Sequence, residues 1–138
     1  MSDIIVVVTG GFDPLHSGHI AYFKEAKKLG NKLIVGINSD AWLTKKKGSP
    51  FLPFNERLEI VSNIDVVDEA IGFEDDELNS AADAISQTIQ RYPNNKIVFA
   101  NGGDRGSKNT PEMDKFASND NVIFEFGVGG DFKMNSSS

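Results

Sequence analysis

The sequence contains no cysteine, and this absence excludes several classes of protein at once. A disulfide-bonded scaffold, a thiolate nucleophile and a zinc or iron–sulfur site with cysteine ligands all require that residue. Basic residues are also few, since 14 Lys+Arg stand against 20 Asp+Glu and give a formal net charge of -6. Dedicated nucleic-acid-binding proteins usually carry a basic excess, so we expect no nucleic-acid partner.

Long apolar segments are missing as well. No run approaches the roughly 20 apolar residues that a membrane span requires, and no basic leader precedes the short apolar run that begins at Ile4. We therefore expect a soluble, cytoplasmic protein with no membrane partner. The 138 residues fit a single domain, and 39% hydrophobic with 25% charged residues exclude broad disorder.

Apolar and amphipathic segments alternate along the chain, which is typical of an α/β protein. β-branched runs predict strands, and apolar residues three or four positions apart predict helices between them. We expect strands at 4–8, 32–37, 66–73, 96–100 and 122–126, helices at 17–29, 55–63, 78–92 and 111–117, and an irregular basic stretch at 38–53. The pattern predicts a single Rossmann-like, doubly wound domain over residues 1–138, with a five-stranded parallel sheet and helices on both faces.

Ligands of doubly wound sheets bind beyond the carboxyl ends of the strands. The segment after the first expected strand reads GGFDPLHSGH from Gly10 to His19, and it contains both histidines of the chain, His16 and His19. A strand, a glycine turn and a helix start make an anion site, because the backbone can approach the ligand and the helix offers unpaired N–H groups. Two imidazoles there, with Gly18 leaving space between them, would add donors to the same phosphate.

The two histidines also have interpretations other than phosphate binding. A lone histidine near a helix start is usually a structural or capping residue, but a pair directly after a strand is a more demanding pattern and favours function. A zinc site would need carboxylates to complete its ligand set, because the chain has no cysteine and no third histidine. The dinucleotide fingerprint and the P-loop are both absent.

The run from Gly11 to His19 resembles the His-x-Gly-His signature of the nucleotidyltransferases of the cytidylyltransferase-like superfamily. The resemblance continues in order through residues 36–40, 45–48, 53–57, 66–69, 73–76 and 101–104. Such enzymes transfer a nucleotidyl group from a nucleoside triphosphate to a phosphorylated alcohol or sugar and release pyrophosphate. The resemblance implies direct in-line attack without a covalent enzyme intermediate, a reaction that depends on positioning and charge neutralisation.

The resemblance also implies roles for individual residues. His16 and His19 would hold the triphosphate and stabilise charge on the reacting α-phosphate, and Lys46 or its neighbours Lys45 and Lys47 would supply a mobile cation. Arg57 would supply a second cation, Asp40 an orienting contact, and Mg²⁺ would travel with the nucleotide. The further nucleotide-binding residues around the signature would be Gly10, Gly11, Phe12, Asp13 and Gly18.

Each of the charged residues also has a simpler interpretation. The lysines could form a solvated loop. Arg57 could make a surface ion pair with Glu56 or Glu59. Asp40 could be a helix N-cap.

Two segments further along are candidates for the rest of a nucleotide site. The segment from Asn101 to Arg105 follows the fourth strand, where Gly103 would let the backbone approach a base and Asp104 would accept hydrogen bonds from ribose or base; a tight turn is the alternative. Ser136 and Ser137 resemble part of the family's Ser/Thr triplet, which opens a last helix and contacts the β- and γ-phosphates. We expect that helix to be truncated here, or the serines to be a flexible tail.

The nucleotide and the acceptor are indicated less directly. Segments after the second, third and fourth strands look more like the adenylyltransferase domain of ADP-heptose synthesis than like glycerol-3-phosphate cytidylyltransferases, which favours ATP and a sugar phosphate over CTP and a polyol phosphate. The resemblance further implies a homodimer. A non-catalytic nucleotide-binding module and a scaffold protein without a ligand are the alternatives from other classes.

Overall fold

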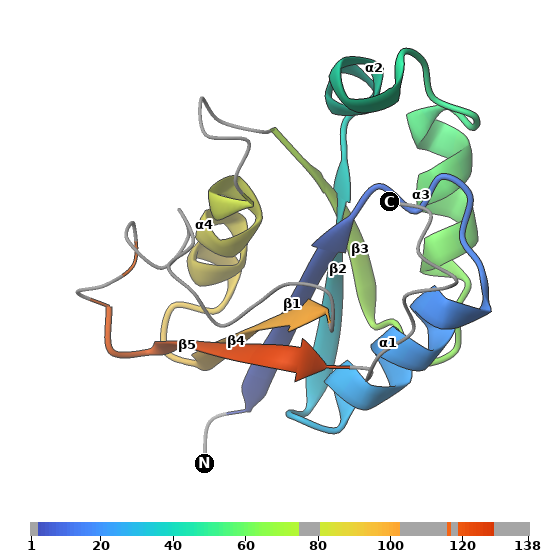
Figure 1. Cartoon of the computed structure of the whole chain (residues 1–138). Helices are drawn as coiled ribbons and strands as arrows, with labels where there is room; N and C mark the ends of the chain where they lie inside the picture. Colours follow the sequence, from blue (N-terminus) through green and yellow to red (C-terminus); the bar gives the residue numbers. More distant parts are fainter. Residues whose placement is uncertain (1–2, 75–80, 103–115, 117–118, 129–138) are drawn as a thin grey trace.

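The computed structural model describes residues 3–74, 81–102, 116 and 119–128 (Figure 1). Five strands form one sheet with the order β3-β2-β1-β4-β5, and every neighbouring pair is parallel. The strands are β1 (Ile4–Gly10), β2 (Lys32–Asn38), β3 (Glu69–Phe73), β4 (Lys96–Gly102) and β5 (Val122–Val128). The helices are α1 (Ser17–Lys27), α2 (Asp40–Lys47), α3 (Phe54–Ser62) and α4 (Ala82–Arg91). The predicted Rossmann-like α/β domain is confirmed.

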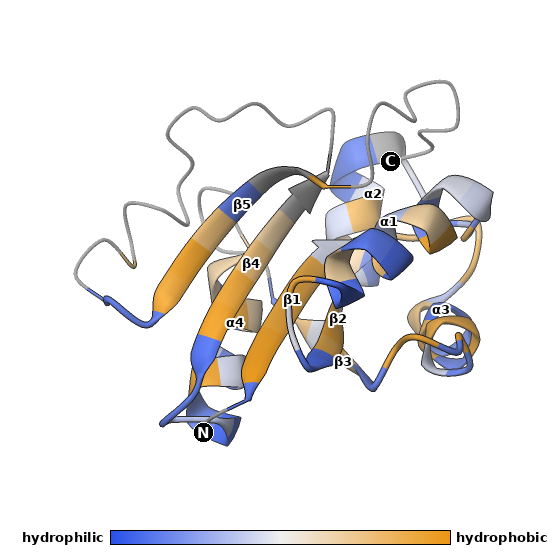
Figure 2. Cartoon of the chain, turned by 90° about the horizontal axis from the view of Figure 1, so that it is seen from below, coloured by the Kyte–Doolittle hydropathy of each residue, from blue (hydrophilic) through white to orange (hydrophobic). Residues whose placement is uncertain are grey.

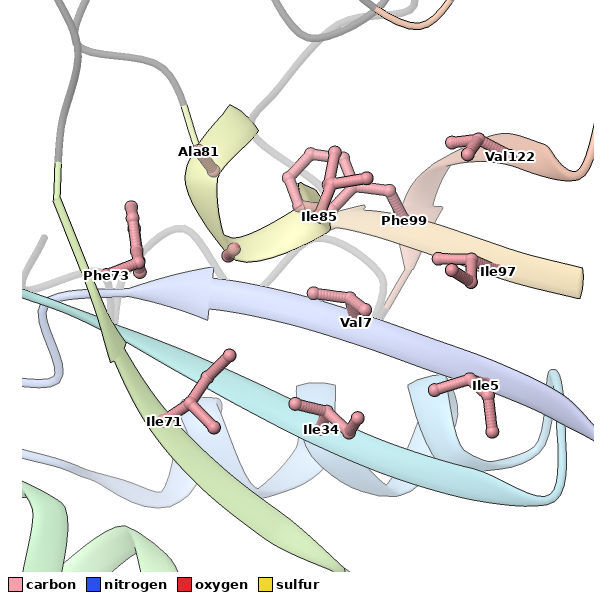
Figure 3. Close-up of a cluster of buried hydrophobic side chains, with 11 residues drawn as sticks. Ile5, Val7, Ile34, Ile71, Phe73, Ala81, Ile85, Ile97, Phe99 and Val122 are labelled. Carbon is pink, nitrogen blue, oxygen red and sulfur yellow. The ribbon is translucent and has the colours of Figure 1, made fainter. Parts of the chain in front are cut away.

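The central strand is apolar throughout because both faces of the sheet are covered. Residues Ile5 to Val8 of β1 are completely buried, and successive side chains point to opposite faces. Ile5 and Val7 pack in a cluster with the other strands and α4 (Figure 3). Val6 and Val8 pack in a second cluster with α1 and α3. Figure 1 shows α4 on one side of the sheet and α1 and α3 on the other, and Figure 2 shows how apolar the strands between them are.

The strand order brings the expected ligand segments to one edge. The chain runs outward from β1 through β2 to β3, then returns to place β4 on the other side of β1. The turn after β1 therefore lies at the topological switch point, where ligands of such sheets bind. The segments after β2 and β3 lie to one side of it and the segment after β4 to the other.

The stretch 38–53, expected to be irregular, instead contains the helix α2. The Ser39 side chain caps this helix by accepting the Trp42 N–H at 3.1 Å, so the sequence-based alternative of Asp40 as the cap is wrong. Leu43 anchors the helix in the core with 1% exposure. Gly48, with φ of 92°, ends it in the left-handed region that favours glycine. The sequence pattern did not predict this short helix, because it ends in three adjacent lysines and has only a narrow apolar face.

Two other boundaries also differ. The third strand begins at Glu69 and not at residue 66, because Val67 and the residues before it form turns after α3. The first helix ends at Lys27, two residues early, and α4 begins at Ala82 within the expected range 78–92. The helix expected at 111–117 falls outside the described residues, apart from Phe116. Among the described helices, none has the length and apolarity needed to cross a membrane.

Candidate active site

The two histidines of the signature face each other at the start of α1. The His16 side chain caps the helix by accepting the Gly18 N–H at 3.1 Å, and the His19 side chain accepts the His16 N–H at 3.2 Å. Their rings stack with centroids 3.9 Å apart and an interplanar angle of 23°. Gly18, whose N–H the His16 side chain accepts, is buried. The spacing of the motif thus creates a reciprocal cap that fixes both imidazoles.

This cap also fixes the proton positions on both neutral rings. Both histidines accept a backbone N–H through Nδ1, so in the neutral form each carries its hydrogen on Nε2. The Nε2 of His16 is buried and has no hydrogen-bond partner among the described residues. A buried donor without a partner is costly, and such a group points to a ligand acceptor.

His19 is neutral at pH 7. Burial, followed by the proximity of His16, lowers the pKa of His19 from 6.5 to about 4. In the ligand-free protein this histidine is therefore a neutral hydrogen-bond donor and carries no positive charge. Charge for an anionic ligand has to come from other residues.

The turn between β1 and α1 is shaped by Phe12. This residue has φ of 52°, and its buried ring packs edge-on against His19 and Phe23, with centroids 5.0 and 5.2 Å away. Gly10 makes room for the ring, because a Cβ on that residue would lie 2.9 Å from Phe12 Cζ. Phe12 is among the residues expected to bind the nucleotide, and its ring packs against His19 in the core.

Asp13 holds a distant loop against this turn. It is 4% exposed, and its two carboxylate oxygens accept the N–H groups of Phe51 and Leu52, each at 2.6 Å. The loop at residues 48–53 connects α2 to α3. Asp13 therefore joins the segment that follows the lysines of α2 to the turn between β1 and α1.

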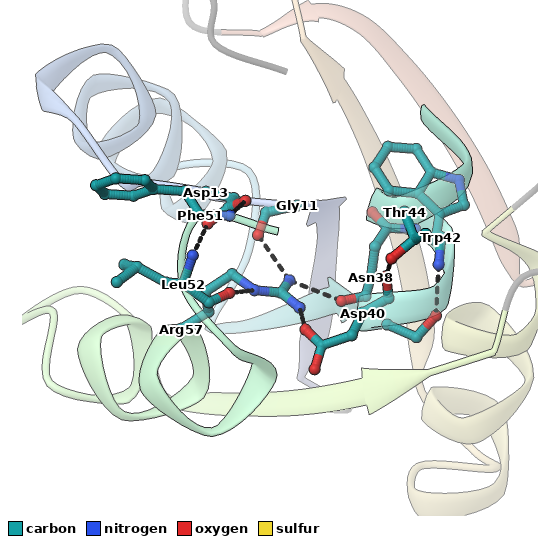
Figure 4. A network of polar contacts seen from close by, with 10 residues as sticks. Gly11, Asp13, Asn38, Asp40, Trp42, Thr44, Phe51, Leu52 and Arg57 are labelled. Atoms are coloured by element: carbon teal, nitrogen blue, oxygen red, sulfur yellow. Dashed lines mark hydrogen bonds and ion pairs between the residues drawn. The ribbon is translucent and has the colours of Figure 1, made fainter. Parts of the chain in front are cut away.

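Arg57 connects the turn after β1, the end of β2 and the loop before α3 (Figure 4). Its side chain is completely buried. It donates to the carbonyl oxygens of Gly11 at 2.9 Å, Asn38 at 2.7 Å and Leu52 at 3.0 Å. It also pairs with the half-exposed carboxylate of Asp40 at 2.6 Å. The sequence-based alternative of a surface ion pair with Glu56 or Glu59 is therefore wrong, because the guanidinium is buried among three carbonyls, two of which come from distant segments.

The lysines expected to neutralise phosphate lie on α2. Lys45 and Lys46 are exposed, and the Lys46 ammonium sits over the Trp42 ring, 4.7 Å from its centroid. Nothing is described of the Lys47 side chain. Sequence reasoning missed Trp42, because its i, i+4 spacing from Lys46 has meaning only once the segment is a helix.

The opposite side of the expected nucleotide site is described only in part. The backbone of Asn101 extends β4, and the Tyr22 hydroxyl donates to the carbonyl of Ala100 just before it. Gly103, Asp104, Ser136 and Ser137 lie outside the described residues.

A cleft of about 270 Å³ lies beyond the carboxyl ends of β2 and β3. Sequence reasoning missed it, since it combines four segments of the chain. Gln87 donates to the carbonyl of Gly72 at 3.0 Å, and Asp83 accepts the Glu74 N–H at 3.0 Å. These bonds fix α4 against the end of β3. The cleft is lined by Ser39, Asp40, Phe54, Gly72, Phe73, Glu74, Asp83 and Gln87.

No group of three or more histidine and acidic side chains that could hold a metal ion occurs within the described ranges.

Comparison with known proteins identifies the family of the chain. A model of the family described as cytidylyltransferase-like matches residues 7–123, which include the histidine signature, Arg57 and the segment after β4. The chain belongs to this family of nucleotidyltransferase enzymes.

The chain is also similar to individual proteins of known name. The chain is 37% identical over 111 residues to the bifunctional protein HldE of Erwinia tasmaniensis and 33% identical to that of Escherichia coli O1:K1 / APEC, in each case over 72% of this chain. It spans only 23% of the length of these relatives. Among solved structures it is similar to the lipopolysaccharide core biosynthesis protein from Thermoplasma volcanium GSS1, with 28% identity and a TM-score of 0.66. That similarity covers 91% of this chain and 95% of the other.

Proposed function

We propose that the protein transfers a nucleoside monophosphate, from ATP in preference to CTP, to the phosphate of a sugar phosphate and releases pyrophosphate. The observation that carries the proposal is the buried Nε2 of His16, which has no hydrogen-bond partner among the described residues and lies beside His19 at the switch point of the sheet. A phosphate oxygen is the acceptor that this donor needs. The acceptor class draws support from the lipopolysaccharide core biosynthesis protein that the chain resembles.

In the proposed reaction, the two histidines donate hydrogen bonds from fixed positions, and the lysines supply positive charge. The acceptor's phosphate oxygen attacks the α-phosphorus of the nucleotide in line, the bond to the β-phosphate oxygen breaks, and pyrophosphate leaves with the electron pair. His16 and His19 would donate from Nε2 to the α-phosphate oxygens, where negative charge must be stabilised as the reaction proceeds. Lys46, with Lys45 beside it, would neutralise the triphosphate, because His19 is neutral at pH 7. No side chain needs to act as a nucleophile.

The nucleotide would lie across the switch point. Gly10, Gly11 and Gly18 would allow its phosphates to approach the backbone, while Asn101 at the end of β4 and Gly103 beyond it would flank the base. Asp104 would contact ribose or base, and Ser136 and Ser137 the terminal phosphates. Phe12, Asp13, Asp40 and Arg57 would act indirectly, since each is engaged with other parts of the protein at the base of the site.

Mg²⁺ fits this site as a companion of the triphosphate. The described side chains offer no cluster of three ligands, which suits an ion that prefers phosphate oxygens and water. When bound it would neutralise phosphate charge and help pyrophosphate to leave.

The cleft beyond β2 and β3 is our candidate for the sugar of the acceptor. Carboxylates of Glu74 and Asp83 and the amide of Gln87 can bond hydroxyl groups, and the rings of Phe54 and Phe73 offer apolar surface. Its acidic lining would disfavour the phosphate, which would point instead toward the lysines and histidines.

The test is pyrophosphate release by the purified protein with ATP or CTP, each against heptose 1-phosphate, other sugar 1-phosphates, glycerol 3-phosphate and choline phosphate. ATP with a sugar phosphate should give the highest kcat/KM. Higher kcat/KM with CTP and glycerol 3-phosphate would favour the polyol-phosphate alternative. Nucleotide binding without turnover on any acceptor would indicate a non-catalytic module. Gel filtration tests the proposed homodimer, and cell fractionation the proposed cytoplasmic location.

A further inference from the structure

Trp42, the sole tryptophan of the chain, lies near both Gly11 in the turn after β1 and the Lys46 ammonium. A Cβ placed on Gly11 would lie 3.4 Å from Cζ3 of the Trp42 ring, which is ordinary van der Waals contact. The backbone of Trp42 is fixed by its bond to the Ser39 cap and by the neighbouring Leu43, which is buried. The indole therefore lies beside Gly11, in the turn that is proposed to bind the triphosphate.

The face of this ring carries the Lys46 ammonium. The distance from Nζ to the ring centroid is 4.7 Å, within the range of a cation–π interaction. Trp42 and Lys46 are four residues apart on α2, so the helix itself brings them to one face. An exposed lysine otherwise samples many rotamers, and restricting them before a ligand arrives reduces the entropy that binding must overcome.

We propose that Trp42 is a positioning residue that holds Lys46 beside the Gly10–Gly11 turn, ready to contact the phosphates of the nucleotide. The inference rests on the proposed function for the role of Lys46. Trp42 acts through the lysine and needs no contact with the substrate.

The test is a double-mutant cycle on Trp42 and Lys46, with inorganic tripolyphosphate as the probe and calorimetry as the readout. Lys46→Ala should weaken binding at least about tenfold, as expected for loss of a charged hydrogen bond. Trp42→Leu should weaken it about two- to fivefold, the range of an exposed cation–π contact. Trp42→Phe keeps an aromatic face and should recover most of the affinity. In the Lys46→Ala background, Trp42→Leu should have no further effect.

Lys32→Ala is the matched control. Lys32 also lies over an aromatic ring, that of Tyr92 at 5.6 Å, but it begins β2 at the opposite edge of the sheet. This variant should bind tripolyphosphate like the wild type. The fluorescence of Trp42 gives a second readout: Lys46→Ala should change the emission of the ligand-free protein, and Lys32→Ala should not.

Several results would overturn the inference. One is that Trp42→Leu lowers the affinity for tripolyphosphate equally with and without Lys46. Another is that Trp42→Leu binds tripolyphosphate as tightly as the wild type or more tightly. The third is that Lys46→Ala binds it like the wild type. Thermal unfolding of each variant checks the fold, and if Trp42→Leu does not fold, a folded Trp42→Phe with the affinity of Lys46→Ala also overturns it. Failure of the proposed function is distinguishable, because the wild type would then bind tripolyphosphate without releasing pyrophosphate from any nucleotide, while the cycle would still measure the coupling.

Discussion

Replacing Arg57 by methionine should destabilise the protein strongly, even without a ligand. Methionine keeps much of the length of the side chain but removes every donor. The carbonyls of Gly11, Asn38 and Leu52 then lose the guanidinium, and the carboxylate of Asp40 loses its ion pair. Because Arg57 has 0% exposure, water cannot replace these bonds without opening the base of the site.

The magnitude follows from the number of partners. Each carbonyl left without a donor costs about 1–3 kcal/mol when buried, and the half-exposed Asp40 adds little because water solvates it. The expected loss is about 3–5 kcal/mol, similar to that for removing one partner of a buried ion pair. For a domain of this size roughly 3–4 °C correspond to each kcal/mol, so Tm should fall by about 10–20 °C.

The assay is thermal unfolding followed by circular dichroism, with Arg91→Met as the matched control. Arg91 pairs with Glu69 on the surface and is 48% exposed, so the same substitution there should cost no more than about 1 kcal/mol. If Arg57→Met melts within about 3 °C of Arg91→Met, the guanidinium does not hold the three segments together. A loss of nucleotide affinity without a loss of Tm would instead assign Arg57 to the phosphates.

Three further predictions concern the histidines and a packed turn. His16→Asn, which can still cap α1, and His19→Ala should each keep the fold but lower kcat for pyrophosphate release about a hundredfold, since each removes one donor to the phosphate; wild-type turnover in both would refute the mechanism. Because the pKa of His19 falls from 6.5 to about 4 on folding, the unfolded chain takes up a proton that the folded protein does not, and stability should decrease as pH drops from 7 to 5. Urea unfolding across this range should give a smaller decrease for His19→Asn, and an equal slope in both proteins would contradict the shift. Gly30→Ala should cost about 1–3 kcal/mol, because its Cβ would lie 2.6 Å from the backbone oxygen of Ile4; an unchanged urea midpoint would show that the turn adapts.

The sequence predicted the fold well where the central strands of the sheet are buried on both faces. A strand covered on both faces must be apolar at every position, so β1 and β2 are recognisable without any knowledge of their neighbours. The signature at His16 and His19 is equally local, because the histidines cap the helix on which they lie. Its resemblance to a known family was confirmed by the match to the cytidylyltransferase-like model.

The sequence predicted the middle of the chain less well. Helix α2 has an apolar face of little more than Leu43, and its lysines suggested a loop. Its cap at Ser39 and its end at Gly48 are ordinary signals, but they are too weak to identify a helix of eight residues. The contact between Trp42 and Lys46 could not be predicted before that helix was known.

What the sequence by itself determined is the alternation of buried strands and amphipathic helices, together with the local histidine motif after β1. What only the tertiary structure decided is how the remaining polar residues are used. Arg57 is buried because carbonyls 46 and 19 positions away meet around it, and an arginine in such surroundings reads in the sequence like any exposed one. A charged group can be buried only where partners from distant segments replace water, and those partners come together only when the sheet has formed.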